Sequence, residues 1–274
     1  MMDYGLYYMC VIIGSDEFVK PIIIIQARMG SKRMPGKVMK PILGRPMLWH
    51  IVNRIRLVSG IKDVVIATTN LPGDEPIRIF CKESGINFFA GSESDVLDRF
   101  YQAAVKYAAD PIIRITGDCP LVDPGIVKKL LELYETNRYD HVGVACGAGA
   151  DALTCGKYPD GLDAECFSFA ALQYAWQEAK AMLDREHVTS YIWSNKQLFK
   201  CGSLNSKNDY SHYRLTVDYE EDFTLITRIY EALFRKEKAF VFTDVIKYLA
   251  SNPALSKINN FHNNINTAMK FSNR

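Results

Sequence analysis

Residues 26–37 concentrate positive charge and glycine in a way that suits the binding of an anion. The segment reads Gln-Ala-Arg-Met-Gly-Ser-Lys-Arg-Met-Pro-Gly-Lys. Glycines let backbone N–H groups approach an anion closely, and cationic side chains neutralise its charge. The cations are Arg28, Lys32, Arg33 and Lys37. A solvated basic loop without a ligand would leave this crowding of like charges unexplained, so the pattern predicts a site for a polyphosphate such as a nucleoside triphosphate.

The spacing excludes two common phosphate-binding loops. A P-loop requires G-x-x-x-x-G-K-[ST], but five residues separate Gly30 from Gly36, and Val38 follows Lys37 where Ser or Thr should stand. The G-x-G-x-x-G fingerprint of dinucleotide-binding folds does not occur in this segment either. The basic segment is therefore a loop of another kind.

Two aspartates each follow an apolar segment that we expect to form a strand. Asp118 comes soon after Ile112–Thr116, and Asp218 directly follows residues 214–217. Magnesium prefers one or two carboxylates together with substrate phosphates and retained waters. An aspartate after a strand is also typical of a turn or a helix cap. Residue type alone leaves both interpretations open.

A second acidic group, Asp160, Asp163 and Glu165, lies in the later half of the chain. A strand through Asp163 and Glu165 would point both carboxylates to one face, because side chains alternate along a strand. Like charges held together need a partner such as a cation or several hydroxyls. We expect these carboxylates, with Arg185 and Glu186, to bind an acceptor rich in hydroxyls or carrying an amine. The alternative is a solvated edge strand.

The elements that position these residues follow from hydrophobic periodicity. Strands are predicted at 22–25, 64–68, 112–116, 141–145, 163–167 and 214–217. Helices are predicted at 47–58, 74–84, 95–107, 124–134, 169–181, 185–195, 220–235 and 243–250, with 220–222 as a solvated helix start. Alternating strands and helices predict an α/β fold with an open, mostly parallel sheet, helices on both faces and an inserted acceptor-side lobe.

The chain divides into three predicted parts. Residues 1–19 form an N-terminal extension, residues 20–258 the main domain, and residues 259–274 an Asn-rich tail that we expect to fray. Within the main domain, residues 20–139 are the nucleotide-binding half and residues 140–258 the acceptor-side half.

Composition narrows the class of function. The formal net charge of +2 gives no bulk attraction to nucleic acid, and no apolar run reaches the length of a membrane span. Seven scattered cysteines without a C-x-x-C pair argue against a disulfide framework or a zinc site. We therefore expect a cytoplasmic protein with reduced thiols, no nucleic-acid partner and no membrane insertion.

Several segments in order resemble a known family. Ala27, Arg28, Ser31, Arg33 and Lys37 match the A-R-x-x-S-x-R-x-x-x-K signature of the cytidylyltransferases. The chain most resembles the spore coat polysaccharide biosynthesis F-type cytidylyltransferases, relatives of the enzymes that make CMP-sialic acid and CMP-Kdo. The resemblance runs from residue 22 to about 258 and includes 91–99, 114–121, 158–165, 185–189 and 216–218.

This resemblance implies an enzyme with a fold like the nucleotide-diphospho-sugar transferases. It would transfer CMP from CTP to a small polar acceptor, such as a sugar acid, and release pyrophosphate, for surface polysaccharide or glycan biosynthesis. It would be a magnesium-dependent homodimer.

The resemblance also assigns site residues. Lys37 and Arg33 would face the β- and γ-phosphates and act in catalysis with Asp118, and Asp118 and Asp218 would hold the magnesium ion. The nucleotide-binding residues would be Ala27, Arg28, Gly30, Ser31, Arg33, Lys37, Ser92, Asp95 and Arg99.

Two other enzyme classes remain as alternatives. A sugar-1-phosphate nucleotidyltransferase using UTP or dTTP has a G-x-G-T-R-x-x-P-x-x-x-K loop, and Arg28 stands where that loop has its first glycine. A glycosyltransferase of similar architecture carries a D-x-D motif, for which Asp160 and Asp163 are one residue too far apart.

Overall fold

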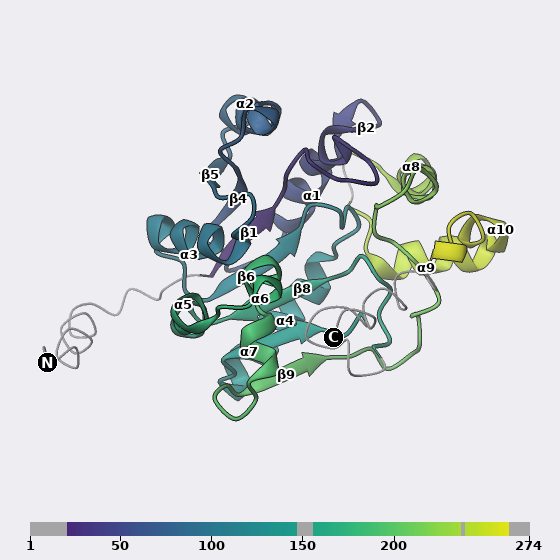
Figure 1. Ribbon diagram of the computed structural model, residues 1–274. Coiled ribbons are helices and arrows are strands. Elements are labelled where there is room, and N and C mark those ends of the chain that lie inside the picture. The colour runs from purple at the N-terminus through teal and green to yellow at the C-terminus, as the bar shows by residue number, and fades with distance from the viewer. Residues whose placement is uncertain (1–20, 147–155, 237–238, 263–274) are drawn as a thin grey trace, which may run out of the picture.

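The computed structural model describes residues 21–146, 156–236 and 239–262 (Figure 1). The predicted N-terminal extension and the tail beyond His262 lie outside the described residues.

Seven strands form one mixed sheet in the order β5-β4-β1-β6-β8-β7-β9 (Figure 1). Strand β1 pairs in parallel with β4 and β6, and β4 pairs in parallel with β5. Strand β9 runs parallel to β7. Strand β8 alone is antiparallel to both its neighbours, β6 and β7. The strands are β1 (Ile22–Gln26), β4 (Asp63–Thr69), β5 (Asn87–Gly91), β6 (Ile112–Thr116), β7 (His141–Val144), β8 (Ala164–Phe167) and β9 (Cys201–Leu204). This confirms the predicted α/β class with a mostly parallel sheet.

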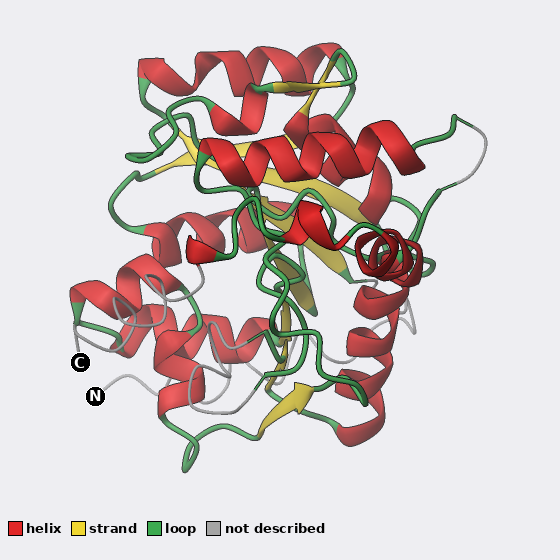
Figure 2. Ribbon diagram, turned by 90° about the vertical axis from the view of Figure 1, so that its right-hand side faces the viewer, coloured by secondary structure: helices red, strands yellow, loops and turns green. Residues whose placement is uncertain are grey.

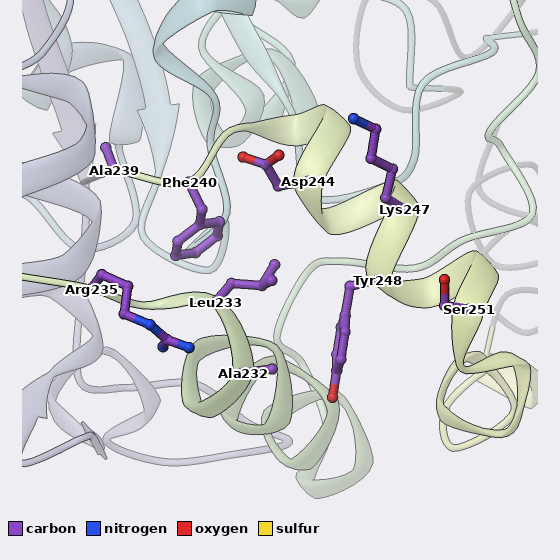
Figure 3. A pocket seen from close by; sticks show the side chains of 9 residues that line it. All are labelled: Ala232, Leu233, Arg235, Ala239, Phe240, Asp244, Lys247, Tyr248 and Ser251. Atoms are coloured by element: carbon purple, nitrogen blue, oxygen red, sulfur yellow. The ribbon is translucent and has the colours of Figure 1, made fainter.

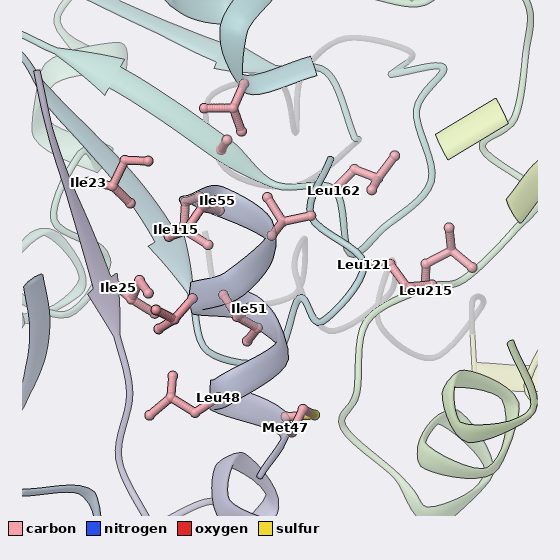
Figure 4. Close-up of a cluster of buried hydrophobic side chains, with 14 of the residues drawn as sticks. Ile23, Ile25, Met47, Leu48, Ile51, Ile55, Ile115, Leu121, Leu162 and Leu215 are labelled. Carbon is pink, nitrogen blue, oxygen red and sulfur yellow. The ribbon is translucent and has the colours of Figure 1, made fainter. Parts of the chain in front are cut away.

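Helices cover both faces of the sheet (Figure 2), because its central strands are apolar on both sides. Ile23 and Ile25 of β1 point into a core that includes side chains of α1, α2, α4, α8 and α9 (Figure 4). Ile22 and Ile24 point the other way, into a core with α3, α5 and α7. The helices are α1 (Met47–Ile55), α2 (Glu75–Glu83), α3 (Val96–Tyr107), α4 (Pro124–Asn137), α5 (Phe169–Glu178), α6 (Met182–His187), α7 (Ser190–Ser194), α8 (Glu220–Leu233), α9 (Phe242–Ser251) and α10 (Pro253–Ser256).

The loops that leave the parallel strands meet at the carboxyl edge of the sheet. The N–H of Gly117 donates to the carbonyl of Gln26 at 2.8 Å, which joins the end of β6 to the end of β1. A Cβ on Gly117 would lie 2.9 Å from that carbonyl oxygen, so only glycine permits this approach. The loop after β6 and the basic loop after β1 are thereby held side by side.

Two predicted elements are wrong. Residues 214–217 form no strand of the sheet; Arg214 makes only an isolated bridge with Asp160, because the segment pairs with loops rather than with a full strand. The predicted helix 185–195 is broken into α6 and α7 at Val188, whose φ is 61°. Strands β5 and β9 were not predicted, and neither is apolar throughout.

Among the described residues, no helix is long and apolar enough to cross a membrane. A cavity of about 460 Å³ lies between α8 and α9, with Leu233, Phe240 and Tyr248 among its lining residues (Figure 3). It contains none of the predicted site residues.

Candidate active site

Lys37 and two aspartates from distant segments meet at the carboxyl edge of the sheet. The Nζ atom of Lys37 lies 3.1 Å from Oδ2 of Asp118 and 3.0 Å from Oδ1 of Asp218. It also donates to the carbonyl oxygen of Val217 at 2.6 Å. The structure thus brings together Lys37, which was predicted to bind phosphates, and the two aspartates, which were predicted to hold a metal ion.

The charges in this cluster stabilise one another. Burial alone would raise the pKa of Asp118, but the ammonium of Lys37 outweighs burial and lowers it. Burial would likewise raise the pKa of Asp218, and Lys37 and Arg33 bring it well below its usual range. Burial lowers the pKa of Lys37, but the two carboxylates reverse this and raise it. All three groups are therefore charged at neutral pH.

Asp218 is held by two further cations. Nη2 of Arg33 lies 2.7 Å from its Oδ1, and Nη2 of Arg214 lies 3.1 Å from its Oδ2. Arg214 is fully buried and also contacts Asp160 at 2.8 Å. Asp160, predicted to bind the acceptor, is thus an ion-pair partner of Arg214.

At the start of α8, Glu220 is exposed and Glu221 partly exposed, as the sequence predicted, but the prediction is wrong for Asp222. Asp222 is fully buried, and its carboxylate accepts from Arg214 and from the backbone N–H groups of Asp218 and Tyr219. Asp222 therefore positions Asp218 in two ways, through the side chain of Arg214, which contacts both aspartates, and through the backbone N–H of Asp218.

The expectation that the chain frays from Asn259 is also wrong for the described residues. Asn259 is buried, and its Nδ2 donates to Asp222 Oδ1 at 2.7 Å and to the Arg214 carbonyl at 3.1 Å. The ring of His262 stacks on that of Tyr219 at 3.8 Å, and Tyr219 lies 5.0 Å from the guanidinium of Arg33. This end of the chain packs against the site because its amide and ring complete a buried polar network.

The basic loop is fixed by groups that leave Arg28, Lys32 and Arg33 at the surface, whereas Lys37 is buried. Asp74, which is buried, accepts the backbone N–H of Met29 at 2.7 Å. Ser31 Oγ accepts the N–H of Met34 at 3.2 Å, so this side chain shapes the loop. Arg28 is 39% exposed and pairs with Glu93 at 3.4 Å. The buried Ala27 continues β1, and Gly30 lies beside Glu93.

The loop after β5 is built by the residues predicted to bind the nucleotide. Ser92 Oγ accepts the N–H of Asp95, and Asp95 caps α3 by accepting the N–H of Asp98. Arg99 is fully buried and donates to the Ser92 carbonyl at 2.8 Å. Burial lowers the pKa of Arg99 to about 10. Asp95 and Arg99 therefore hold this loop, of which Glu93 and Ser94 are exposed.

Glu165, predicted to bind the acceptor, is buried, and its carboxylate is paired with protein groups. Its Oε1 accepts from Thr189 at 2.7 Å and contacts His141 at 3.1 Å, and Oε2 pairs with Arg114. Although burial favours the neutral acid, Arg114 and His141 lower the pKa of Glu165 to about 2. Burial of this carboxylate is possible because partners on β6, on β7 and in the segment after α6 all contact it.

Arg185 and Glu186, the other predicted acceptor residues, behave differently. Arg185 Nε lies 3.0 Å from both carboxylate oxygens of Asp95, while Glu186 is exposed. Asp163 Oδ2 accepts the N–H of Gly161 and lies 3.9 Å from Sγ of Cys119. Asp163 is therefore close to the Asp118 side of the site.

A strained turn separates the exposed and buried parts of the 185–189 segment. The N–H of Thr189 donates to the carbonyl of His187 at 2.6 Å, which closes a γ-turn at Val188. A β-branched residue rarely adopts this positive φ, and such strain persists only where the surroundings enforce it. The turn leaves His187 exposed while Thr189 reaches Glu165.

The donor set at the Lys37 cluster fits a magnesium ion. One carboxylate oxygen of Asp118 and one of Asp218 point at the same position, which the ammonium of Lys37 occupies. The side chain of Asp118 is 30% exposed. Two carboxylates with room for phosphates and water are what magnesium requires. Among the described residues, no group of three or more His, Cys, Asp or Glu could hold a metal alone.

Sequence reasoning missed Asp74, Arg214 and Asp222. Two local signals were available. Arg214 is a cation in an otherwise apolar segment, and Asp222 is an acid at the third position of α8, which is typical of helix capping. No local signal marks the contact of Asp74 with the basic loop.

Comparison with known proteins places these features in a family. A family model described as cytidylyltransferase matches residues 22–265. An uncharacterised protein of Methanocaldococcus jannaschii is 37% identical over 246 residues, which are 88% of this chain and 95% of that protein. The spore coat polysaccharide biosynthesis protein SpsF of Bacillus subtilis is 30% identical over 239 residues, 85% of this chain and 95% of that protein.

Solved structures agree. A cytidylyltransferase from Leptospira borgpetersenii superposes with a TM-score of 0.79 at 30% identity, covering 87% of this chain and 97% of that chain. A CMP:2-keto-3-deoxy-manno-octonic acid synthetase complexed with CTP has a TM-score of 0.58 at 19% identity, over 78% of this chain and 100% of that chain, and so shares the fold.

Proposed function

Because the chain belongs to the cytidylyltransferase family, we propose that it transfers CMP from CTP to a sugar acid or a similar small polar acceptor. Pyrophosphate is the second product. The observation that carries this proposal is the convergence of Lys37, Asp118 and Asp218 beside the basic loop. The cluster offers both a cation for phosphate oxygens and carboxylates for a metal.

The residues have separate tasks in this reaction. An acceptor oxygen attacks the α-phosphorus of CTP in line with the departing pyrophosphate, so the protein mainly positions reactants and stabilises charge. Arg33 and Lys37 contact the β- and γ-phosphates and stabilise the leaving group. Asp118 and Asp218 hold magnesium, which supplies positive charge against the phosphate oxygens.

The acceptor binds on the side of the site where Asp163 lies. Cys119 Sγ is 3.7 Å from Oδ1 of Asp118 and 3.9 Å from Oδ2 of Asp163, so the two aspartates flank one thiol. The name of the Bacillus relative supports an acceptor that enters a surface polysaccharide. An 8-amino-3,8-dideoxy-manno-octulosonate cytidylyltransferase of Shewanella, 33% identical over 119 residues or 42% of this chain, supports a sugar acid.

We also propose a cytoplasmic homodimer. Free thiols at Cys81, Cys119, Cys146, Cys166 and Cys201 suit a reducing compartment. Sedimentation of the purified protein tests the dimer.

Pyrophosphate release tests the activity. The purified protein is given CTP, UTP, dTTP, ATP or GTP, each with magnesium and either a sugar acid such as Kdo or sialic acid or a sugar 1-phosphate. We expect release with CTP and a sugar acid, and loss of release when a chelator removes the metal. Equal or faster release from UTP with a sugar 1-phosphate would contradict the proposal.

A further inference from the structure

The ammonium group of Lys37 sits where three oxygen atoms converge. They are Oδ2 of Asp118, Oδ1 of Asp218 and the carbonyl oxygen of Val217, at 3.1, 3.0 and 2.6 Å from Nζ. The side chain of Lys37 is only 10% exposed. Such a shell of oxygens around a buried charge is the environment of a bound cation, here supplied by the protein itself.

The backbone at Lys37 is anchored, so only its side chain can leave this position. Its N–H donates to the carbonyl of Met34 at 3.2 Å, and its own carbonyl accepts from Lys40 at 3.1 Å. The next residue, Val38, is buried in the core. The four-carbon stem of lysine is flexible and its head is a compact charge, which permits the ammonium to move while the loop stays in place.

The two carboxylates depend on Lys37 to different degrees. Asp218 also pairs with Arg33 and Arg214. Across the described part of the chain, Lys37 is the one cation within ion-pair distance of Asp118. Lys37 is buried and Asp118 is 30% exposed, so separating them without a replacement leaves poorly solvated charges. The ammonium therefore leaves Asp118 at low cost only when another cation replaces it.

We propose that Lys37 holds the place of the divalent cation in the nucleotide-free protein and exchanges with it when metal and triphosphate arrive together. This inference rests on the proposed nucleotidyl-transfer function. In the exchange the ammonium passes from the carboxylates to the phosphates, so every charge keeps a partner throughout. The free protein accordingly binds the metal weakly, and nucleotide and metal bind cooperatively.

A lysine that only contacted phosphate would not compete with a metal ion in the nucleotide-free protein, whereas Lys37 does. Removing Lys37 lowers turnover, because a cation facing the leaving group is lost. The same change strengthens binding of a divalent cation to the nucleotide-free protein, because the competing ammonium is gone.

Binding of Mn²⁺, a paramagnetic substitute for Mg²⁺, is measured by electron paramagnetic resonance on nucleotide-free protein. We expect Lys37→Met to bind Mn²⁺ about tenfold more tightly than the unmodified protein or better, since a competing unit charge is removed. Lys37→Arg keeps the charge and should stay weak. Adding Asp118→Asn to Lys37→Met should abolish the gain.

Lys37→Gln gives the same reading if Lys37→Met does not fold, because it keeps a donor for the Val217 carbonyl. Unchanged or weaker Mn²⁺ binding in a folded neutral variant overturns the exchange, as does a gain that survives Asp118→Asn. Pyrophosphate release by the unmodified protein is measured separately. If Mn²⁺ binding tightens but no pyrophosphate is released from CTP, the proposed function fails and the exchange stands. If pyrophosphate is released but Mn²⁺ binding does not tighten, the exchange fails and the proposed function stands.

Discussion

Arg185 forms an ion pair with Asp95, a residue 90 positions earlier in the chain, with Nε of Arg185 3.0 Å from both carboxylate oxygens. The pair joins α6 to the N-terminus of α3, which Asp95 caps. The sequence assigned Asp95 to the nucleotide and Arg185 to the acceptor. The structure instead links the two sides of the proposed site through these side chains.

Asp95→Ala and Arg185→Ala should both destabilise the protein, and Asp95→Ala should cost more because it also removes the N-cap of α3. Each removes the same pair, so we expect a coupling energy of about 1 to 2 kcal/mol in a double-mutant cycle of chemical unfolding. Arg228→Ala is the matched control, because Arg228 belongs to an exposed pair with Glu231 and should change stability by less than about 0.5 kcal/mol. A rise in acceptor KM for Arg185→Ala alone would show that Arg185 binds the acceptor directly.

Asp118→Asn and Asp218→Asn should each abolish magnesium-dependent turnover while differing in stability. Asp218 is 13% exposed and pairs with Arg33, Lys37 and Arg214, so its neutralisation weakens three ion pairs at once, two of them with buried cations. We expect a loss of about 1 to 3 kcal/mol for Asp218→Asn and a smaller loss for the more exposed Asp118. Initial rates at several magnesium concentrations and thermal unfolding measure both effects. Near-normal turnover at limiting magnesium would remove that residue from the metal site.

Glu165→Gln should flatten the dependence of stability on pH in acid. The folded protein holds the pKa of Glu165 at about 2, below the ordinary value of 4.5, so this carboxylate binds a proton less readily folded than unfolded. Its stabilisation is complete above about pH 5 and is lost as pH falls toward 2, and it amounts to about 3 kcal/mol. Unfolding free energies measured between these limits check the prediction.

The control for this pH profile is Glu83→Gln, a change at an exposed glutamate, which should leave the profile unaltered. A Glu165→Gln protein with the same acid sensitivity as the unmodified one would mean that other carboxylates dominate.

Asn259→Ala should weaken the site from the far end of the chain. The change removes two hydrogen bonds, to Asp222 and to the Arg214 carbonyl, and should cost about 1 to 3 kcal/mol of stability together with a fall in kcat. Asn259→Asp should cost more, because it sets a second carboxylate against Asp222. Asn252→Ala is the control: Asn252 is exposed, and its side-chain amide donates to the Tyr248 carbonyl. Equal losses for Asn252→Ala and Asn259→Ala would contradict the positioning role.

Much of the fold could be predicted because its signals are local. The continuous run Ile22–Ile25 identifies a strand buried on both faces, and the polar start at Asp95 marks the beginning of α3. Val188 shows the limit of this reasoning. Its β-branched side chain fits the apolar pattern of a continuing helix, and only the packing around it enforces the positive φ that ends α6.

The sequence by itself determined the α/β class, the family and the presence of a basic loop beside carboxylates at strand ends, because these depend on residue type and short-range spacing. Only the tertiary structure decided which charges pair. It set Lys37 between Asp118 and Asp218, buried Glu165 with Arg114, and connected Asp222 to Asn259. Those pairings depend on the distances between segments far apart in the chain and on the cost of burying a charge without a partner, and neither is encoded in any local pattern.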